Sequence, residues 1–290
     1  MPKILFITDI GSPWGGSEEL WSKAARILIK EGYQVHASIG WFGTVHPKVQ
    51  ELIDLGIHVR FRKNNVRAFI RKVADYKNSD FLYKFRSNIE KHINQTSPDL
   101  ILFSQSHIFS AWRPMLYAKK NNLKYAVVSQ LNSELSWPND NNYKRIRQAF
   151  LSAEKCFFVS KGNLQLLETQ LALRLPNSEI VSNPFNMAEV IELEWPQTAS
   201  LNIAFVGRLD FIHKGIDILF NSFANKKWQN RNYQLNIYGT GDIELAKELI
   251  NFLKIKNVVF HGQVNNIHDI WRHNHILALA SRYEGMPLVM

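Results

Sequence analysis

The stretch between Lys3 and Leu20, KILFITDIGSPWGGSEEL, is the clearest indication of the fold. A short apolar run at residues 4–8 is typical of a buried strand, and a loop containing Gly15 and Gly16 follows it. Ser17 is able to cap the helix that we expect at residues 18–31. A strand, a glycine turn and a helix form the repeating unit of a parallel sheet with crossover helices.

The same alternation continues along the chain. Further strands are predicted at residues 34–39, 58–61, 100–104, 125–129 and 155–159, with helices such as 112–121 between them. After a polar break at residues 187–200, strands are predicted at 201–206, 234–238, 258–260 and 276–279, and helices at 216–225, 243–254 and 267–273. The fold class predicted is therefore α/β, with two doubly wound Rossmann-like domains.

We place these domains at residues 1–195 and 196–290. In doubly wound sheets ligands bind beyond the carboxyl ends of the strands, so we expect a ligand in the cleft between the domains. The second domain has about four predicted strands, whereas such domains usually have five or six. We therefore expect the second domain to be incomplete and the chain to be C-terminally truncated.

The composition excludes several classes of protein. Of the 290 residues, 46% are hydrophobic and 21% charged, which excludes disordered, fibrous and small disulfide-stapled proteins. Cys156 is the single cysteine, so it forms no internal disulfide and no cysteine-based metal cage, and a reducing, cytoplasmic setting is expected. No apolar run approaches the length of a membrane-spanning helix, and the N-terminus does not resemble a signal peptide.

The positive charge is concentrated in one segment. The chain carries a net +10, and residues 60–91 contain ten basic and three acidic residues. Val66, Phe69, Ile70 and Val73 follow a helical spacing, so this segment could lie on an anionic membrane surface. The alternative is a solvated basic face on a helix that packs inside its own domain. Nucleic acid is not expected as a partner, because no regular series of stacking aromatics and no recognition motif accompanies these charges.

Two glycine-bearing loops could bind an anion. The N-terminal loop ends at a helix N-terminus, which favours anions, although a plain strand-to-helix turn explains it as well. After the strand at 201–206 come Gly207-Arg208 and, six residues after Arg208, Lys214-Gly215. A planar guanidinium and a mobile ammonium suit a phosphate group, while two solvated surface cations are the simpler alternative.

Several motifs, taken in their order along the chain, resemble those of a known protein family. The motifs are Gly207-Arg208 with Lys214-Gly215, Gly239-Thr240-Gly241, His261-Gly262-Gln263-Val264, and Ser281-Arg282-Tyr283-Glu284-Gly285-Met286-Pro287. Together they resemble the donor half of a retaining GT-B glycosyltransferase of family four, the glycosyl transferases group 1. The loop Gly15-Gly16-Ser17-Glu18 and the strand at 100–104 leading to His107 resemble its acceptor half.

The resemblance implies a role for each matching residue. Arg208 and Lys214 would hold the donor diphosphate and neutralise the leaving group, without a metal ion or another cofactor. Glu284 would lie near the transferred sugar as the first acid of an E-x7-E motif, and His107 would hydrogen-bond the sugar or the acceptor. The remaining residues implied in donor binding are Gly15, Gly16, Ser17, Gly239, Val264, Met286, Pro287, Leu288 and Val289.

The function implied is transfer of a sugar from a nucleotide diphosphate sugar to a hydroxyl of a glycan or lipid-linked glycan, with retention at the anomeric carbon. The enzyme would be cytoplasmic, with possible peripheral contact to the inner face of an anionic membrane through residues 60–91. The second acid of E-x7-E would fall at position 292, past the last residue. A non-catalytic module that binds anionic lipid or acidic glycan is therefore the alternative. An epimerase, phosphorylase or sugar-phosphate synthase of related fold is another.

Overall fold

The computed structural model describes residues 1–63, 88–184, 192–264 and 266–289. It divides into two compact units, the first formed by Met1–Pro184 with Gly285–Leu288 and the second by Phe185–Glu284 with Val289–Met290. The predicted domain boundary at residue 195 stays a prediction. The predicted helix that contains Val66 and Val73 lies outside the described residues.

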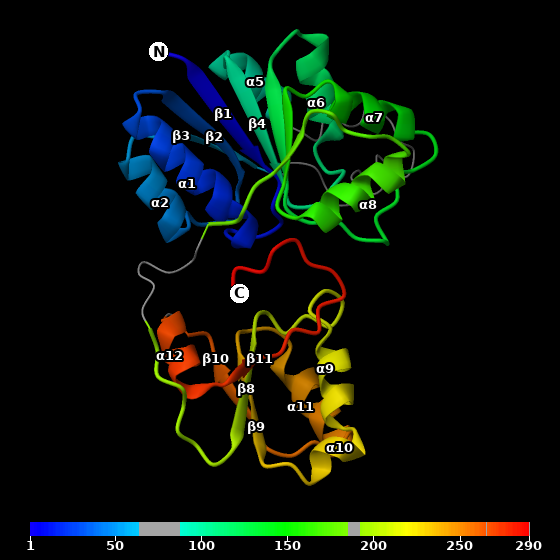
Figure 1. Cartoon of the computed structure of the whole chain (residues 1–290). Coiled ribbons are helices and arrows are strands. Elements are labelled where there is room, and N and C mark those ends of the chain that lie inside the picture. Colours follow the sequence, from blue (N-terminus) through cyan, green and yellow to red (C-terminus); the bar gives the residue numbers. More distant parts are fainter. Residues whose placement is uncertain (64–87, 185–191, 265, 290) are drawn as a thin grey trace. The chain divides into compact units, whose positions relative to one another are not determined.

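The first unit contains a seven-stranded sheet in which each pair of neighbours is parallel (Figure 1). Its order is β3-β2-β1-β4-β5-β6-β7. The strands are β1 (Lys3–Thr8), β2 (Gln34–Gly40), β3 (His58–Arg62), β4 (Leu100–Gln105), β5 (Tyr125–Ser129), β6 (Lys155–Phe158) and β7 (Ser178–Ile180). The described helices are α1 (Gly16–Lys30), α2 (Pro47–Asp54), α5 (Ile89–Thr96), α6 (Trp112–Lys120), α7 (Tyr143–Leu151) and α8 (Lys161–Leu171).

Helices cover both faces of this sheet. Alternate residues of β1 point to opposite faces, so the strand contributes to a core on each side. Ile4 and Phe6 pack with Trp21 of α1 in one core, whereas Leu5 and Ile7 pack in a second core with Phe103 of β4. All six are less than a tenth exposed. Burial on both faces explains why the strand has a continuous apolar sequence.

The second unit contains a four-stranded parallel sheet in the order β10-β9-β8-β11. Its strands are β8 (Leu201–Val206), β9 (Tyr233–Tyr238), β10 (Val258–Gly262) and β11 (Ile276–Leu277). Its helices in the described residues are α9 (Ile216–Phe223), α10 (Lys226–Gln229), α11 (Ile243–Phe252) and α12 (Ile267–His273). The predicted α/β class with two doubly wound units is confirmed.

Two strands differ from the sequence prediction. β7 was not predicted, because three residues that include Ser178 and Glu179 show no apolar run. The strand predicted at 276–279 has only two residues in β11, although Ala278 still donates its N–H to the Ala204 carbonyl at 2.8 Å.

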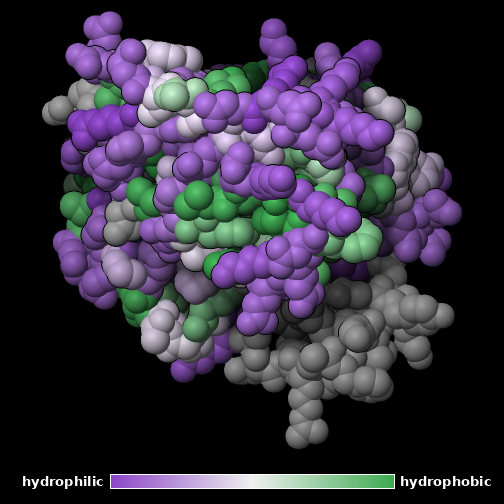
Figure 2. Space-filling view, turned by 90° about the horizontal axis from the view of Figure 1, so that it is seen from below, coloured by the Kyte–Doolittle hydropathy of each residue, from purple (hydrophilic) through white to green (hydrophobic). Residues whose placement is uncertain are grey.

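Apolar side chains also reach the surface. Phe252 at the end of α11 is 80% exposed and Ile276 in β11 is 45% exposed. Figure 2 shows hydrophobic residues gathered in the middle of one face, framed by hydrophilic ones. In the part of the chain that the structure describes, no helix combines the length and the apolar character that crossing a membrane requires.

The core of the second unit yields the first testable prediction. Phe220 on α9 is fully buried, so Phe220→Ala should lower the free energy of unfolding of this unit by about 3–5 kcal/mol through lost burial and a cavity. Ile218→Ala on the same helix, where the side chain is 41% exposed, is the matched control and should cost far less. Native-state hydrogen exchange of the β8 and β9 amides in the full chain measures both values. Equal effects of the two substitutions would contradict this account of the core.

Candidate functional site

The sheet order places a switch point in the second unit between β8 and β11. Both strands run parallel to each other, so their carboxyl ends lie at the same edge of the sheet. β8 continues into Gly207 and Arg208, and the segment after β11 continues to Glu284. The chain returns from α12 to this edge, which brings residues seventy positions apart into contact.

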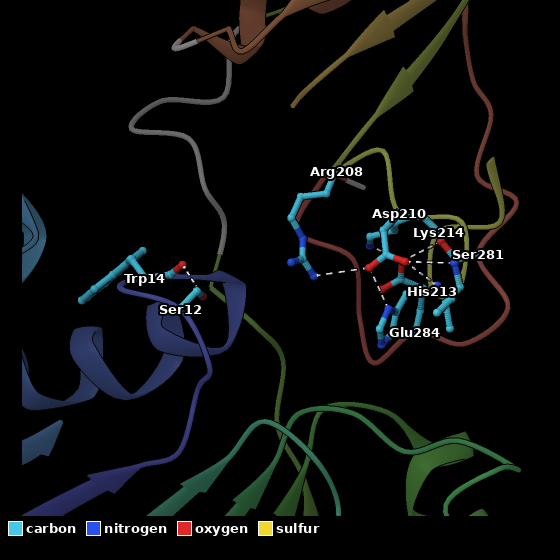
Figure 3. A network of polar contacts seen from close by, with 9 residues as sticks. Ser12, Trp14, Arg208, Asp210, His213, Lys214, Ser281 and Glu284 are labelled. Atoms are coloured by element: carbon cyan, nitrogen blue, oxygen red, sulfur yellow. Dashed lines mark hydrogen bonds and ion pairs between the residues drawn. The ribbon is translucent and has the colours of Figure 1, made fainter. Parts of the chain in front are cut away.

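Lys214 and Glu284 form an ion pair at this edge (Figure 3). Ser281 donates its hydroxyl to the same carboxylate oxygen, Glu284 Oε1, at 2.7 Å. About a quarter of each charged side chain is exposed, so the pair is partly shielded from water and remains reachable by a ligand. The loop can approach so closely because Gly215 has φ +61° and a Cβ there would lie 2.0 Å from the Ala280 carbonyl oxygen.

Arg208 and Asp210 lie on the same loop as Lys214 and come before it in the sequence. The Asp210 carboxylate accepts hydrogen bonds from the backbone N–H groups of Ile212 and His213, each at 3.0 Å, and contacts His213 Nδ1 at 2.7 Å. Burial alone would raise the pKa of Asp210, but the hydrogen bonds from His213 outweigh it and hold the pKa below its ordinary value. Arg208 Nη2 lies 3.9 Å from Asp210 Oδ2 with 72% of its side chain exposed, so the guanidinium presents donors to solvent.

The two other candidates of the second unit lie near the ends of β9 and β10. A Cβ on Gly239, which has φ +135°, would lie 1.9 Å from the Gly207 carbonyl oxygen, so a side chain has no room there. Val264 is partly buried in a small cluster with Tyr238 and Ile270. At this edge of the sheet, β8, β9 and β10 end near one another. Glycine backbone and the side chains of Arg208 and Lys214 lie there.

In the first unit the switch point lies between β1 and β4. Asp9 Oδ1 accepts the N–H of Ser106 at 2.7 Å, which joins the ends of the two strands. His107 follows on the exposed side of this turn, and its carbonyl accepts the N–H and hydroxyl of Ser110 at 3.1 and 2.6 Å. The structure therefore puts His107 at the end of β4, as the sequence predicts.

The glycine turn differs from the prediction in one respect. α1 begins at Gly16 with Gly15 as its N-cap, and no side chain caps it, so the prediction that Ser17 is the cap was wrong. Ser17 instead lies inside the first turn, because the helix begins two residues earlier than predicted. The turn is locally ordered by Ser12, which donates to the Trp14 carbonyl at 3.1 Å (Figure 3).

Residues 285–288 group with the first unit. A Cβ on Gly16 would lie 3.1 Å from Leu288 Cδ1, and Asn183 Nδ2 donates to the Met286 carbonyl at 3.0 Å. Of the predicted residues in this segment, Leu288 thus lies at the glycine turn and Met286 at Asn183, whereas Val289 groups with the second unit.

Two carboxyl groups near the turn, Asp9 and Glu18, were not predicted as functional residues, and Glu18 is buried. Glu18 in the first turn of α1 is 2% exposed and accepts a hydrogen bond from the indole N–H of Trp21. Burial raises the pKa of Glu18 to about 7, helped by the charge of Asp9 and opposed by Trp21, Thr8 and Arg62. Burial likewise raises the pKa of Asp9. The position of Asp9 directly after an apolar strand was the signal that could have identified it.

The burial of Glu18 predicts a pH-dependent stability. Because its pKa rises from 4.5 to about 7 on folding, the folded chain binds an extra proton between these values, and stability is lost as the pH rises through this window. Relative to Glu18→Gln, the wild type should lose about 2.5 kcal/mol between pH 5 and pH 8. Urea unfolding of the full chain at both values measures this. The control is Glu51→Gln, an exposed acid of the same unit, and parallel pH profiles for wild type and Glu18→Gln would refute the assignment.

Residues 200–290 match the family model of glycosyl transferases group 1. The comparison with curated protein sequences found no match.

Solved structures match nearly the whole chain. The galactosyltransferase WaaB of the lipopolysaccharide outer core, in its apo form, is 19% identical with a TM-score of 0.63, and the match covers 99% of this chain and 76% of WaaB. Anabaena HepE in complex with UDP and glucose is 15% identical with a TM-score of 0.67, over 97% and 74% of the two chains. S. aureus TarM in complex with UDP is 10% identical with a TM-score of 0.69, over 100% and 83%. The chain thus has the GT-B fold, and its residues 200–290 match the glycosyl transferases group 1 family.

Proposed function

We propose that this chain is a glycosyltransferase that moves a sugar from a nucleotide diphosphate sugar to an acceptor hydroxyl. The observation that carries the proposal is the convergence of Arg208, Lys214 and Glu284 at the switch point of the second unit. The family match over residues 200–290 supports it, as do the UDP complexes of HepE and TarM.

The chemistry requires stabilisation of a diphosphate leaving group. As the bond between the anomeric carbon and the diphosphate oxygen breaks, negative charge develops on the phosphates, and preorganised cations there lower the barrier. Arg208 offers an exposed planar fork and Lys214 a point charge. We propose that these two side chains, rather than a metal ion, neutralise the leaving group.

Glu284 has two roles in this proposal. Its carboxylate holds the Lys214 ammonium in place in the free protein, and Ser281 fixes the same oxygen. When the phosphates attract Lys214, Glu284 is left to accept hydrogen bonds from hydroxyls of the sugar. An ion pair that is only partly buried is suited to this exchange, because breaking it does not strand a buried charge.

The route we propose retains configuration. The acceptor hydroxyl attacks the anomeric carbon from the face that the diphosphate leaves, and its proton passes to an oxygen of the leaving phosphate. No protein base is needed in this step. A role in donor binding for the backbone of Gly15 and Gly16, and a hydrogen bond from His107 to the sugar or acceptor, stay predictions from the sequence. The identity of the acceptor as a glycan and the cytoplasmic location stay predictions. Membrane contact through residues 60–91 also stays a prediction, because residues 64–87 lie outside the described part of the chain.

Calorimetric titration of the 290-residue chain with UDP, GDP and ADP tests the donor site. We expect one nucleotide to bind, and Arg208→Ala and Lys214→Ala each to weaken it at least tenfold, about 1.4 kcal/mol, because each removes a cation from the diphosphate. Lys227→Ala on α10 removes an equal charge away from the switch point and is the matched control. EDTA should leave the affinity unchanged.

Other results would contradict the proposed donor site or the retaining route. Absence of binding by all three nucleotides, or equal losses in Lys214→Ala and Lys227→Ala, would refute the donor site. Formation of a glycoside with inverted configuration would refute the retaining route alone.

A further inference from the structure

The strand β10 ends in a bulge at the carboxyl edge of the second sheet. In its pairing with β9 the register shifts between Phe260 and Gly262, so His261 is the extra residue. Gly262 has φ +70°, and its carbonyl accepts the N–H of Gly239 at 2.7 Å, which joins the ends of the two strands. A bulge changes the direction in which a side chain points. Here it fixes where the His261 side chain leaves the strand.

The His261 ring is held on two sides. It stacks on the Tyr238 ring, with the centroids 4.4 Å apart and the planes 11° from parallel. Its Nε2 lies 2.8 Å from the amide oxygen of Asn236, Oδ1. Tyr238 and Asn236 are both buried, whereas His261 is exposed. The ring therefore has one face against Tyr238 and one edge fixed by Asn236, and its other face is accessible.

Further hydrogen bonds hold Asn236 in place. Its amide nitrogen donates to Asn274 Oδ1 at 2.8 Å, and Asn274 Nδ2 donates to the Tyr238 hydroxyl at 2.9 Å. The Asn236 oxygen thus faces His261, so Nε2 carries the hydrogen of the ring and donates it. Burial lowers the pKa of His261, which keeps the ring neutral at physiological pH. The four side chains form one closed network, and three of them are buried.

This network supports an exposed ring rather than an apolar core. Burying two asparagine side chains costs free energy unless their polar atoms are bonded, and the bonded network specifies a single orientation of the ring. A Cβ on Gly262 would meet no atom within 4 Å, so the space beside the ring is open among the described residues. A preorganised aromatic surface next to open space suits the stacking of a planar ring from a ligand.

The strand order indicates which part of a donor would reach this surface. The strands follow one another in the order β10-β9-β8-β11, about 4.8 Å apart. Arg208 and Lys214 follow β8, and Glu284 follows β11. A nucleotide diphosphate sugar carries its sugar at one end of the diphosphate and its nucleoside at the other. With the diphosphate at Arg208 and Lys214 and the sugar at Glu284, the nucleoside extends over β9 toward β10.

We propose that His261 stacks on the base of the nucleotide donor, and that Asn236 and Tyr238 position its ring for this contact. The inference rests on the proposed function, because it takes the diphosphate to lie at the loop after β8. It goes beyond that function by assigning the nucleoside half of the donor to the end of β10.

Binding of ligands with and without a base tests this contact by calorimetric titration. The ligands are the nucleoside diphosphate that binds in the preceding titration and inorganic pyrophosphate, which has no nucleoside. His261→Ala should weaken nucleotide binding about three- to tenfold, because one aromatic contact is lost. Its affinity for pyrophosphate should not change, which also shows that the variant folds. Lys214→Ala should weaken the binding of both ligands.

Two further variants separate the contact from a general loss of structure. His273→Ala removes another exposed histidine of this unit, whose ring bonds the Asp269 carbonyl within α12 and is not part of the network. It should leave both affinities unchanged. His261→Phe keeps a planar ring over Tyr238 and should retain most of the nucleotide affinity.

A double-mutant cycle tests the positioning role of Asn236. Asn236→Leu has a similar volume but cannot fix the imidazole, so it should weaken nucleotide binding in the wild type. It should have no further effect in the His261→Ala background, since Asn236 acts only through the ring. An equal loss in both backgrounds would overturn the positioning role.

The possible failures separate this inference from the proposed function. If His261→Ala weakens nucleotide and pyrophosphate equally, or if His261→Phe loses as much nucleotide affinity as His261→Ala, the stacking contact is overturned and the donor site stands. If the wild type binds the nucleotide no more tightly than pyrophosphate, the base contact is overturned, whereas Lys214-dependent binding of both still supports the diphosphate site. If neither ligand binds, the proposed function and this inference fail together.

Discussion

The close approach of backbone at the carboxyl ends of the strands is the constraint on which the second unit depends. At Gly239 and Gly215 a side-chain carbon would lie within about 2 Å of a carbonyl oxygen of a neighbouring segment. The contact at Gly215 lets the loop after β8 and the segment after β11 pack against each other, so that Lys214 reaches Glu284. A larger residue at Gly215 would separate these two segments and disrupt the pair of Lys214 with Glu284.

The two units differ in how far their charged groups are exposed to solvent. In the second unit the cations at the switch point are partly or largely exposed, and a ligand can compete for them with the carboxylates that hold them. In the first unit the carboxyl group of Glu18 is buried in the first turn of α1, and Arg62 is engaged with carbonyl oxygens. The first unit therefore keeps a carboxyl group inside the fold, whereas the second unit presents charged side chains where a ligand could reach them.

Sequence alone predicted the order of elements well, because strands buried on both faces have continuous apolar runs. The strand at 125–129 and the helix at 267–273 were predicted with the bounds that the structure has. β7 was missed because an edge strand of three partly polar residues has no such signal. The pairing of Lys214 with Glu284 also follows from no local pattern, since it depends on the parallel pairing of β8 and β11, which places distant segments at one edge.

The error at Ser17 has a physical explanation that bears on the site. Local preference makes serine a good cap, and a serine cap would have satisfied an N–H group at the start of α1. The helix instead begins earlier, at a glycine that has no side chain to accept those bonds. Beginning two residues earlier also places Glu18 in the first turn, facing inward, next to Trp21 and Asp9. The same shift therefore leaves the helix end without a side-chain cap and buries a carboxyl beneath it.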